Sequence, residues 1–213
     1  MAEDSALDAK ILAEDLNNEI VAVPGFSRAL IEEGAASWPL VWFPILGEGR
    51  VGQLQKILSS VISETAEICP VLPSPSKDPR RADLLLAEYR EALFPRGVSA
   101  ISNFLLVHEA HPFESYRQLL RAMKRYRESL ELLGGCRLYL SPLGSKLVTI
   151  GAGLACFDMR TNDPAAKFRI AIPHAEPTRY RVDLASLAAS QPQLCSVLLT
   201  GESYSPDAPA GKT

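Results

Sequence analysis

The loop Ser141-Pro-Leu-Gly-Ser-Lys146 contains the residue types that proteins use to bind an anion. It follows the apolar run CRLYL and precedes a segment rich in glycine and alanine. If a helix begins at Gly144 or Ser145, its first backbone amides would point toward the loop and would bind a phosphate group. The lysine ammonium and two serine hydroxyls would complete the site. The loop is not a Walker A sequence, because GxxxxGK(S/T) is absent. The candidate ligand-binding residues here are Ser141, Gly144, Ser145 and Lys146.

The segment LVTIGAGLACF, residues 147–157, has two interpretations. As a helix, it places its larger apolar side chains on one face and leaves small residues for close packing. As a strand, LVTI would form a hairpin with RLYL and would break the alternation of strands and helices. We favour the helix. Gly151 and Gly153 would each destabilise it by roughly 1 kcal/mol relative to alanine, so we expect a packing reason for them.

A second glycine loop, Gly47-Glu-Gly49-Arg-Val-Gly52, matches the GxGxxG pattern of dinucleotide-binding turns. It lies between an apolar run and an amphipathic segment, as that pattern requires. However, Pro44 interrupts the expected strand, and no acidic residue ends the next strand to bind a ribose hydroxyl. A 2′-phosphate would suit the residues at the start of the following helix, Ser76, Lys77, Arg80 and Arg81, but such a basic pair is usually solvated. We favour a plain strand-to-helix turn and keep NAD(P) binding as the alternative.

Histidines and an arginine–tyrosine pair follow other predicted strands. His108 and His111 lie on a post-strand loop, where they would contact a ligand or transfer a proton. Arg179 and Tyr180 follow the strand FRIAIP and would reach the same ligand, the ring by stacking on a base. The spacing HxxH differs from the helical HExxH, and there is no CxxC, so we expect no metal.

Catalysis by a serine nucleophile is not supported. The segment Gly25-Phe-Ser27-Arg-Ala29 only approaches the GxSxG pattern. A serine hydrolase would also need a histidine base and an acid beside the serine. Because no complete catalytic set is present, the sequence leaves open whether the protein is an enzyme.

Apolar strands alternate with helices along most of the chain, and this alternation predicts βαβ units. We expect one Rossmann-like α/β domain over residues 19–200, with a doubly wound, mostly parallel sheet of about six strands. An N-terminal helix is expected over residues 1–18 and a disordered tail over 201–213. Five post-strand loops should then share the carboxyl edge of the sheet: PGFS, LGEGRVG, PSPSKDP, HEAHPFES and SPLGSK. Ligands bind at this edge in such sheets.

Composition narrows the class of protein. The chain has 213 residues, of which 47% are hydrophobic, which is enough for a core without disulfides or metal. Its net charge of −3 argues against a uniformly basic nucleic-acid binder. No apolar run has the length of a membrane span, and the N-terminus does not resemble a secretory signal. The four cysteines are far apart, so we expect reduced thiols in a cytoplasmic protein.

The strand, the loop ending in Gly144-Ser145-Lys146 and the following small-residue helix resemble the ligand loop of CARF domains. These are Rossmann-like sensors of cyclic oligoadenylates in prokaryotic immunity. The resemblance covers residues 138–157, with Pro142-Leu143 in place of the usual small residues. It implies a homodimer that binds a nucleotide across two copies of the loop, with antiviral defence as the setting.

Three functions follow from these features. The first is a regulatory or sensor module that binds a nucleotide or another phosphorylated ligand. The second is an NAD(P)-dependent oxidoreductase that uses Gly47, Gly49 and Gly52. The third is a non-catalytic interaction subunit of a larger complex, which would expose an apolar surface around Trp38 and Trp42.

Overall fold

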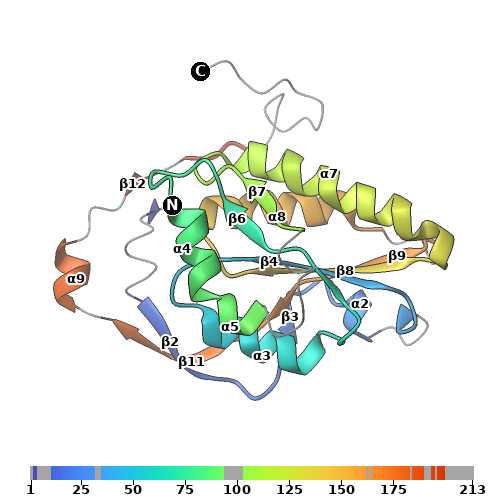
Figure 1. The fold of residues 1–213 in the computed structure, drawn as a ribbon, viewed down its shortest axis with the longest axis horizontal. Coiled ribbons are helices and arrows are strands. Elements are labelled where there is room, and N and C mark those ends of the chain that lie inside the picture. Colours follow the sequence, from blue (N-terminus) through green and yellow to red (C-terminus); the bar gives the residue numbers. More distant parts are fainter. Residues whose placement is uncertain are drawn as a thin grey trace.

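The central element of the computed structural model is a six-stranded sheet whose described pairings are all parallel (Figure 1). The structure describes residues 2–3, 11–31, 35–93, 103–161, 163, 165–182, 184–189, 193–194 and 196–199. The sheet has the order β7–β6–β4–β8–β9, and β5 also pairs with β4. Its strands are β4 (Leu40–Ile45), β5 (Glu67–Ile68), β6 (Val71–Pro73), β7 (Leu105–Val107), β8 (Cys136–Pro142) and β9 (Phe168–Ala171). The predicted α/β class with a mostly parallel sheet is confirmed.

The strand order of the sheet reverses between β4 and β8. The chain starts at the central strand β4, moves outward through β6 to β7, and then returns to add β8 and β9 on the other side. The two central strands pair in register from Leu40 with Arg137 to Ile45 with Pro142. This is the strand-order switch at which doubly wound sheets place their ligands.

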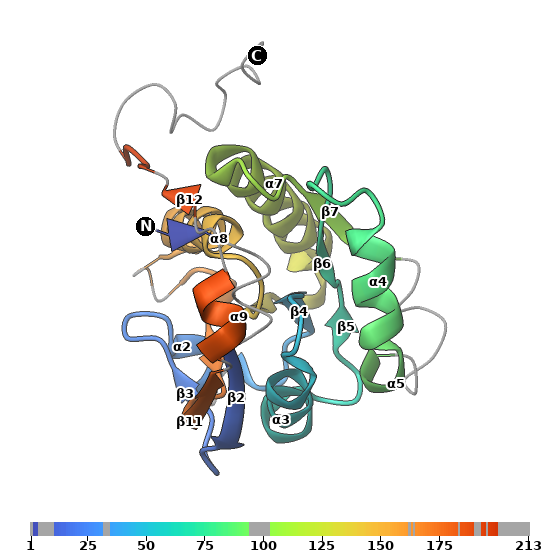
Figure 2. The same cartoon turned by 90° about the vertical axis from the view of Figure 1, so that its left-hand side faces the viewer.

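Helices cover both faces of the sheet (Figure 2). One face carries α3 (Val51–Val61), α4 (Arg81–Glu88) and α5 (Arg90–Leu93), and the other carries α7 (Pro112–Leu130) and α8 (Lys146–Met159). A 3-10 turn, η3 (Glu131–Leu133), follows α7. Alternate residues of β4 point into two separate cores: Val41 and Phe43 toward α7 and α8, Leu40 and Trp42 toward α3 and α4. Both faces of the strand are therefore buried, as its continuous apolar run requires.

Residues 146–159 form α8, which confirms the helical interpretation of residues 147–157. This helix lies close against α7. Ser145 caps the helix by accepting a hydrogen bond from the amide of Val148 (3.4 Å). A Cβ atom added to Gly151 would overlap the backbone of α7 at Pro112 and Tyr116. Gly153 has open space instead. The close approach of the two helices thus accounts for one glycine and leaves the other without a packing role.

The two ends of the described chain meet in short antiparallel pairs outside the central sheet. Strand β2 (Ile11–Leu16) pairs with β11 (Pro177–Val182), β3 (Val21–Ala22) with β10 (Pro173–His174), and β1 (Ala2–Glu3) with β12 (Gln193–Leu194). Two short helices, α2 (Arg28–Ile31) and α9 (Leu184–Ala189), complete the described elements. The N-terminal helix predicted over residues 1–18 is therefore wrong over residues 2–3 and 11–16, because distant strands supply these residues with hydrogen-bond partners. Residues 17–18 are not helical either. Residues 1 and 4–10 of that prediction and the predicted tail over 201–213 lie outside the described residues.

Neither tryptophan lies on an exposed apolar surface. Trp42 is fully buried in the core between the sheet and α3, and Trp38 is half-buried beneath the guanidinium group of Arg169. Within the described residues, these two side chains therefore do not form the exposed apolar surface that the interaction-subunit hypothesis expects. Within the described part of the chain, no helix combines the length and the apolar character needed to span a membrane.

Candidate functional site at the carboxyl edge

Four of the five predicted loops lie at the carboxyl ends of strands in the central sheet. They follow β4, β6, β7 and β8, which run parallel and therefore end at the same edge. The fifth loop, PGFS, follows β3, which pairs with β10 instead of joining this sheet. Its residues Gly25 and Ser27 lie beside the edge strand β9 and the end of α8. The prediction that this loop follows a strand of the central sheet is therefore wrong, although Val23 and Phe26 hydrogen-bond to Ile172, the residue after the carboxyl end of β9.

The crevice between β4 and β8 is filled by the protein's own backbone. A Cβ atom added to Gly47 would overlap the carbonyl oxygen of Leu143, and one added to Gly144 would lie 2.7 Å from the Ile45 side chain. The amide of Leu143 also donates to the carbonyl of Ile45 (3.0 Å). Gly47 and Gly144 therefore allow the loop after β4 and the loop after β8 to pack closely on each other. A ligand at the strand-order switch would have to lie on top of these two loops.

The GxGxxG segment is used within the protein. Gly49 has a positive φ of 70°, and its amide donates to the carboxylate of Glu88 (2.8 Å). The Tyr89 hydroxyl donates to the carbonyl of Gly47 (2.5 Å), while Gly52 lies in the first turn of α3 with open space beside it. A pyrophosphate at this turn would have to displace Glu88. These contacts fit a plain strand-to-helix turn better than an NAD(P) site.

Ser141 stabilises the core. Its side chain is fully buried, accepts a hydrogen bond from the Trp42 indole (2.9 Å) and donates one to the carbonyl of Pro173 (3.2 Å). The hydroxyl group therefore uses its donor and one acceptor position for hydrogen bonds within the protein. Ser145 is also nearly buried and caps α8, whereas Lys146 is the first residue of that helix and is half-buried. Of the predicted loop, Lys146 and the amides around Ser145 remain as the candidate ligand contacts.

An ion cluster that the sequence analysis missed joins three of the loops. Arg81, the first residue of α4, is buried and binds Glu48 with two hydrogen bonds of 2.7 Å, from Nε and Nη2. Its Nη1 is paired with Glu109 in the loop after β7. The sequence analysis treated Arg81 as a solvated residue. The sequence could have indicated the cluster, because Arg81, Glu48 and Glu109 each follow a strand that ends at this edge.

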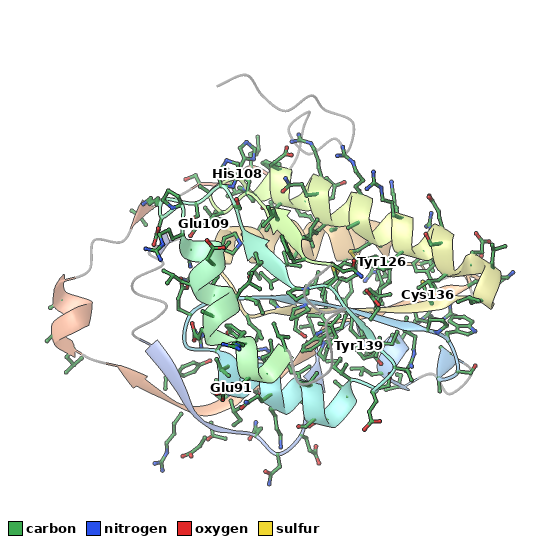
Figure 3. The ribbon with its side chains drawn as sticks, viewed as in Figure 1. Glu91, His108, Glu109, Tyr126, Cys136 and Tyr139 are labelled. Atoms are coloured by element: carbon green, nitrogen blue, oxygen red, sulfur yellow. The ribbon has the colours of Figure 1, made fainter. Side chains whose placement is uncertain are left out.

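Two buried polar atoms at this edge have no hydrogen-bond partner in the described part of the chain, namely Nδ1 of His108 and Oε2 of Glu109 (Figure 3). Buried polar atoms are almost always paired, so each of these atoms calls for a water or a ligand. Arg81 and Ser145 line a cavity of about 10 Å³, which has room for one water at most.

The remaining predicted ligand residues have other positions. His111 caps α7 by accepting a hydrogen bond from the amide of Glu114 through Nδ1 (3.3 Å), and its ring lies 5.9 Å from that of His108. Arg179 and Tyr180 belong to β11, in the ribbon with β2, and Tyr180 is 58% exposed. The structure therefore keeps His108 near the ion cluster and places the arginine–tyrosine pair on a different element.

Three of the cysteines are buried free thiols, which confirms the expectation for Cys69, Cys136 and Cys156. Cys195 lies outside the described residues. Burial raises the pKa of Cys69 and Cys156 to about 12 and that of Cys136 to about 11. A thiol reacts as its thiolate, so these residues are nearly unreactive at neutral pH and become reactive as the pH approaches their raised pKa values.

We expect iodoacetamide at pH 8 to alkylate these three cysteines at least about a hundredfold more slowly than free cysteine, because little thiolate is present. Peptide-resolved mass spectrometry measures each rate separately. The same peptides from urea-unfolded protein serve as the control and should react quickly. Labelling of the folded protein at the rate of free cysteine would contradict the burial described here.

No protein-family model matches the chain, and a search of curated proteins finds no significant match.

Proposed function

We propose that this protein is a Rossmann-like regulatory module that binds a small phosphorylated ligand, such as a nucleotide, at the carboxyl edge of its sheet. The observation that carries the proposal is the position of α8. This 14-residue helix begins directly after β8, beside the strand-order switch. Helix N-termini at this location present amides and partial positive charge to phosphate groups. Lys146 would add a full positive charge at the same point.

The polar groups on the neighbouring loop suit the other half of a nucleotide. Oε2 of Glu109 is a buried acceptor, and Nδ1 of His108 can accept or donate according to its tautomer. Ribose hydroxyl groups are donors and acceptors of this kind. Because the cavity between Arg81 and Ser145 admits only a water-sized group, we expect the ligand to lie across the edge with one group directed inward.

The resemblance to CARF domains extends the proposal to a homodimer that holds one cyclic oligonucleotide between two copies of the loop. Sedimentation velocity with and without cyclic tetra-adenylate tests this extension. We expect the dimer fraction to rise when the nucleotide is added, because each nucleotide would contact both copies. A monomer whose sedimentation is unchanged by the nucleotide would contradict the extension.

A thermal-shift screen of dinucleotides and cyclic oligonucleotides tests the proposal itself. We expect at least one of them to raise the melting temperature, and we expect Lys146→Ala to weaken its binding roughly tenfold to a hundredfold, the range of a lost charge-assisted hydrogen bond. Lys124→Ala is the matched control, because Lys124 is exposed on α7. The melting temperature of the unliganded Lys146→Ala variant should stay close to that of the wild type.

Two results would overturn the proposal. The first is that no nucleotide in the screen changes the melting temperature. The second is that Lys146→Ala leaves nucleotide binding at the wild-type level, which would show that the phosphate is held elsewhere.

A further inference from the structure

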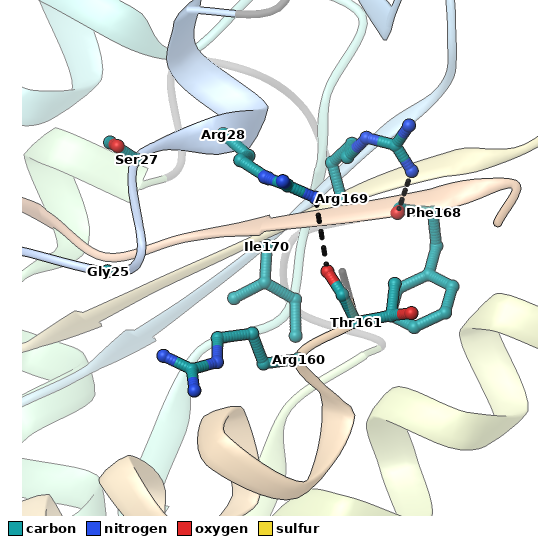
Figure 4. A pocket seen from close by; sticks show the side chains of 8 residues that line it. All are labelled: Gly25, Ser27, Arg28, Arg160, Thr161, Phe168, Arg169 and Ile170. Carbon is teal, nitrogen blue, oxygen red and sulfur yellow. Dashed lines mark hydrogen bonds between the residues drawn. The ribbon is translucent and has the colours of Figure 1, made fainter. Parts of the chain in front are cut away.

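A second polar cavity lies beside the edge strand β9, away from the loops that follow β4, β6, β7 and β8 (Figure 4). Its volume is about 240 Å³, enough for a small molecule or a group of one. Three segments form its walls: residues 25–28, which end at the first residue of α2, residues 160–161 just after α8, and the beginning of β9. Each contributes one arginine, namely Arg28, Arg160 and Arg169.

The described lining of this cavity carries three guanidinium groups and no carboxylate. Arg28 donates from Nη1 to the carbonyl of Thr161 (3.3 Å). The guanidinium of Arg160 lies over the rings of Phe26 (5.7 Å) and Phe157 (5.2 Å). Contacts of this kind orient an arginine without neutralising its charge. In a chain with a net charge of −3, they gather positive charge at one place.

Arg169 makes the cavity more than an exposed patch of charge. The residue is only 5% exposed, although arginine is seldom buried to this extent. It donates to the carbonyl of Phe168 (2.9 Å) and lies over the ring of Trp38 (5.6 Å), so its position is set by the fold. Two more accessible arginines, Arg28 and Arg160, stand on the other walls. One buried charge with two exposed charges beside it suits an oxyanion.

We propose that this cavity binds the phosphate group of a small molecule. The guanidinium groups of Arg28 and Arg160 would donate to the phosphate oxygens, and the hydroxyl group of Ser27 would add a further donor. The C-terminal end of α8 contributes a partial negative charge of about one half, which the two full positive charges of Arg28 and Arg160 outweigh. The cavity is independent of the carboxyl-edge site, because Lys146 and Arg160 stand at opposite ends of a 14-residue helix, roughly 20 Å apart.

Isothermal titration with pyrophosphate tests this inference in the full-length protein. We expect Arg28→Gln and Arg160→Gln each to weaken pyrophosphate binding about tenfold, as expected for one charge-assisted hydrogen bond, and we expect added salt to weaken it in the wild type. Arg121→Gln and Arg125→Gln are matched controls, because both arginines are exposed on α7. Far-ultraviolet circular dichroism verifies that each variant is folded. Equal affinity in the Arg28, Arg160 and control variants would overturn the inference.

Nuclear magnetic resonance separates this site from the carboxyl edge. Pyrophosphate should shift the amide signals of Gly25 and Thr161, and Lys146→Ala should leave those shifts unchanged. Shifts confined to Ser145 and Val148 would overturn this inference while supporting the carboxyl-edge proposal. If the Gly25 and Thr161 signals do not move at millimolar pyrophosphate, this inference is wrong, and the nucleotide screen still decides the carboxyl-edge proposal by itself.

Discussion

Gly151→Ala is expected to lower the free energy of unfolding by about 3 kcal/mol, the upper part of the range for overpacked cores. The added Cβ atom would overlap the carbonyl oxygen of Pro112 and would lie 2.9 Å from the amide nitrogen of Tyr116. Both are backbone atoms of α7, so no side-chain rotation relieves the overlap. Helix α8 would have to move away from α7 and lose part of the packing between them. Urea denaturation followed by circular dichroism measures the change.

Gly153→Ala is the matched control for this prediction. It lies two residues along the same helix, but a Cβ atom there would have no atom within 4 Å. We expect this variant to raise the free energy of unfolding by roughly 1 kcal/mol, because alanine favours the helix and restricts the unfolded chain. If the two variants change stability in the same direction and by the same amount, close packing at Gly151 is not the reason for its presence.

Arg81→Ala is expected to destabilise the protein by about 3–5 kcal/mol, the cost of removing one partner from a buried ion pair. The Arg81 side chain is 9% exposed and that of Glu109 12%, so the variant would leave a buried carboxylate without its cation. Glu48, at 31%, is more exposed and would lose less. Denaturant unfolding at neutral pH measures the effect. Arg80→Ala provides the control, because Arg80 is the neighbouring exposed arginine and should change stability by less than about 0.5 kcal/mol.

A double variant identifies the cause of the Arg81 effect. Adding Glu109→Gln to Arg81→Ala removes the buried negative charge, so we expect it to restore more than half of the lost stability. If Arg81→Ala behaves like Arg80→Ala, the ion cluster contributes little. If the double variant is no more stable than Arg81→Ala alone, the loss comes from the packing of the arginine stem and not from the uncompensated charge.

Local patterns in the sequence were sufficient for the α/β class and for helix α8. Apolar runs of strand length alternate with amphipathic segments, and this alternation favours parallel pairing through βαβ units. The same reasoning placed a helix start at Gly144 or Ser145 and asked for a packing reason at Gly151 and Gly153, which the structure provides in α7 for Gly151 alone. These features depend on residues that are near one another in the chain.

Long-range contacts decided the features that the sequence analysis got wrong or missed. Residues 11–16 form a strand because β11, more than 160 residues away in the pairing of Glu14 with Arg179, supplies its partner. Ser141 has the type and position of a ligand residue, yet its hydroxyl group joins Trp42 to Pro173 in the core. Neither partner is near in sequence, so no local pattern reveals it.

The sequence by itself determined the alternation of strands and helices from β4 to β9 and the edge of the sheet at which most of the loops must end. Only the tertiary structure decided which charges meet, because an arginine and its partners are brought together by strand order and not by spacing. Arg81 meets Glu48 and Glu109 in this way, and Arg28 joins Arg160 and Arg169 around one cavity. Secondary structure is largely set by local preferences, whereas the chemistry of a site depends on distances between residues that are remote along the chain.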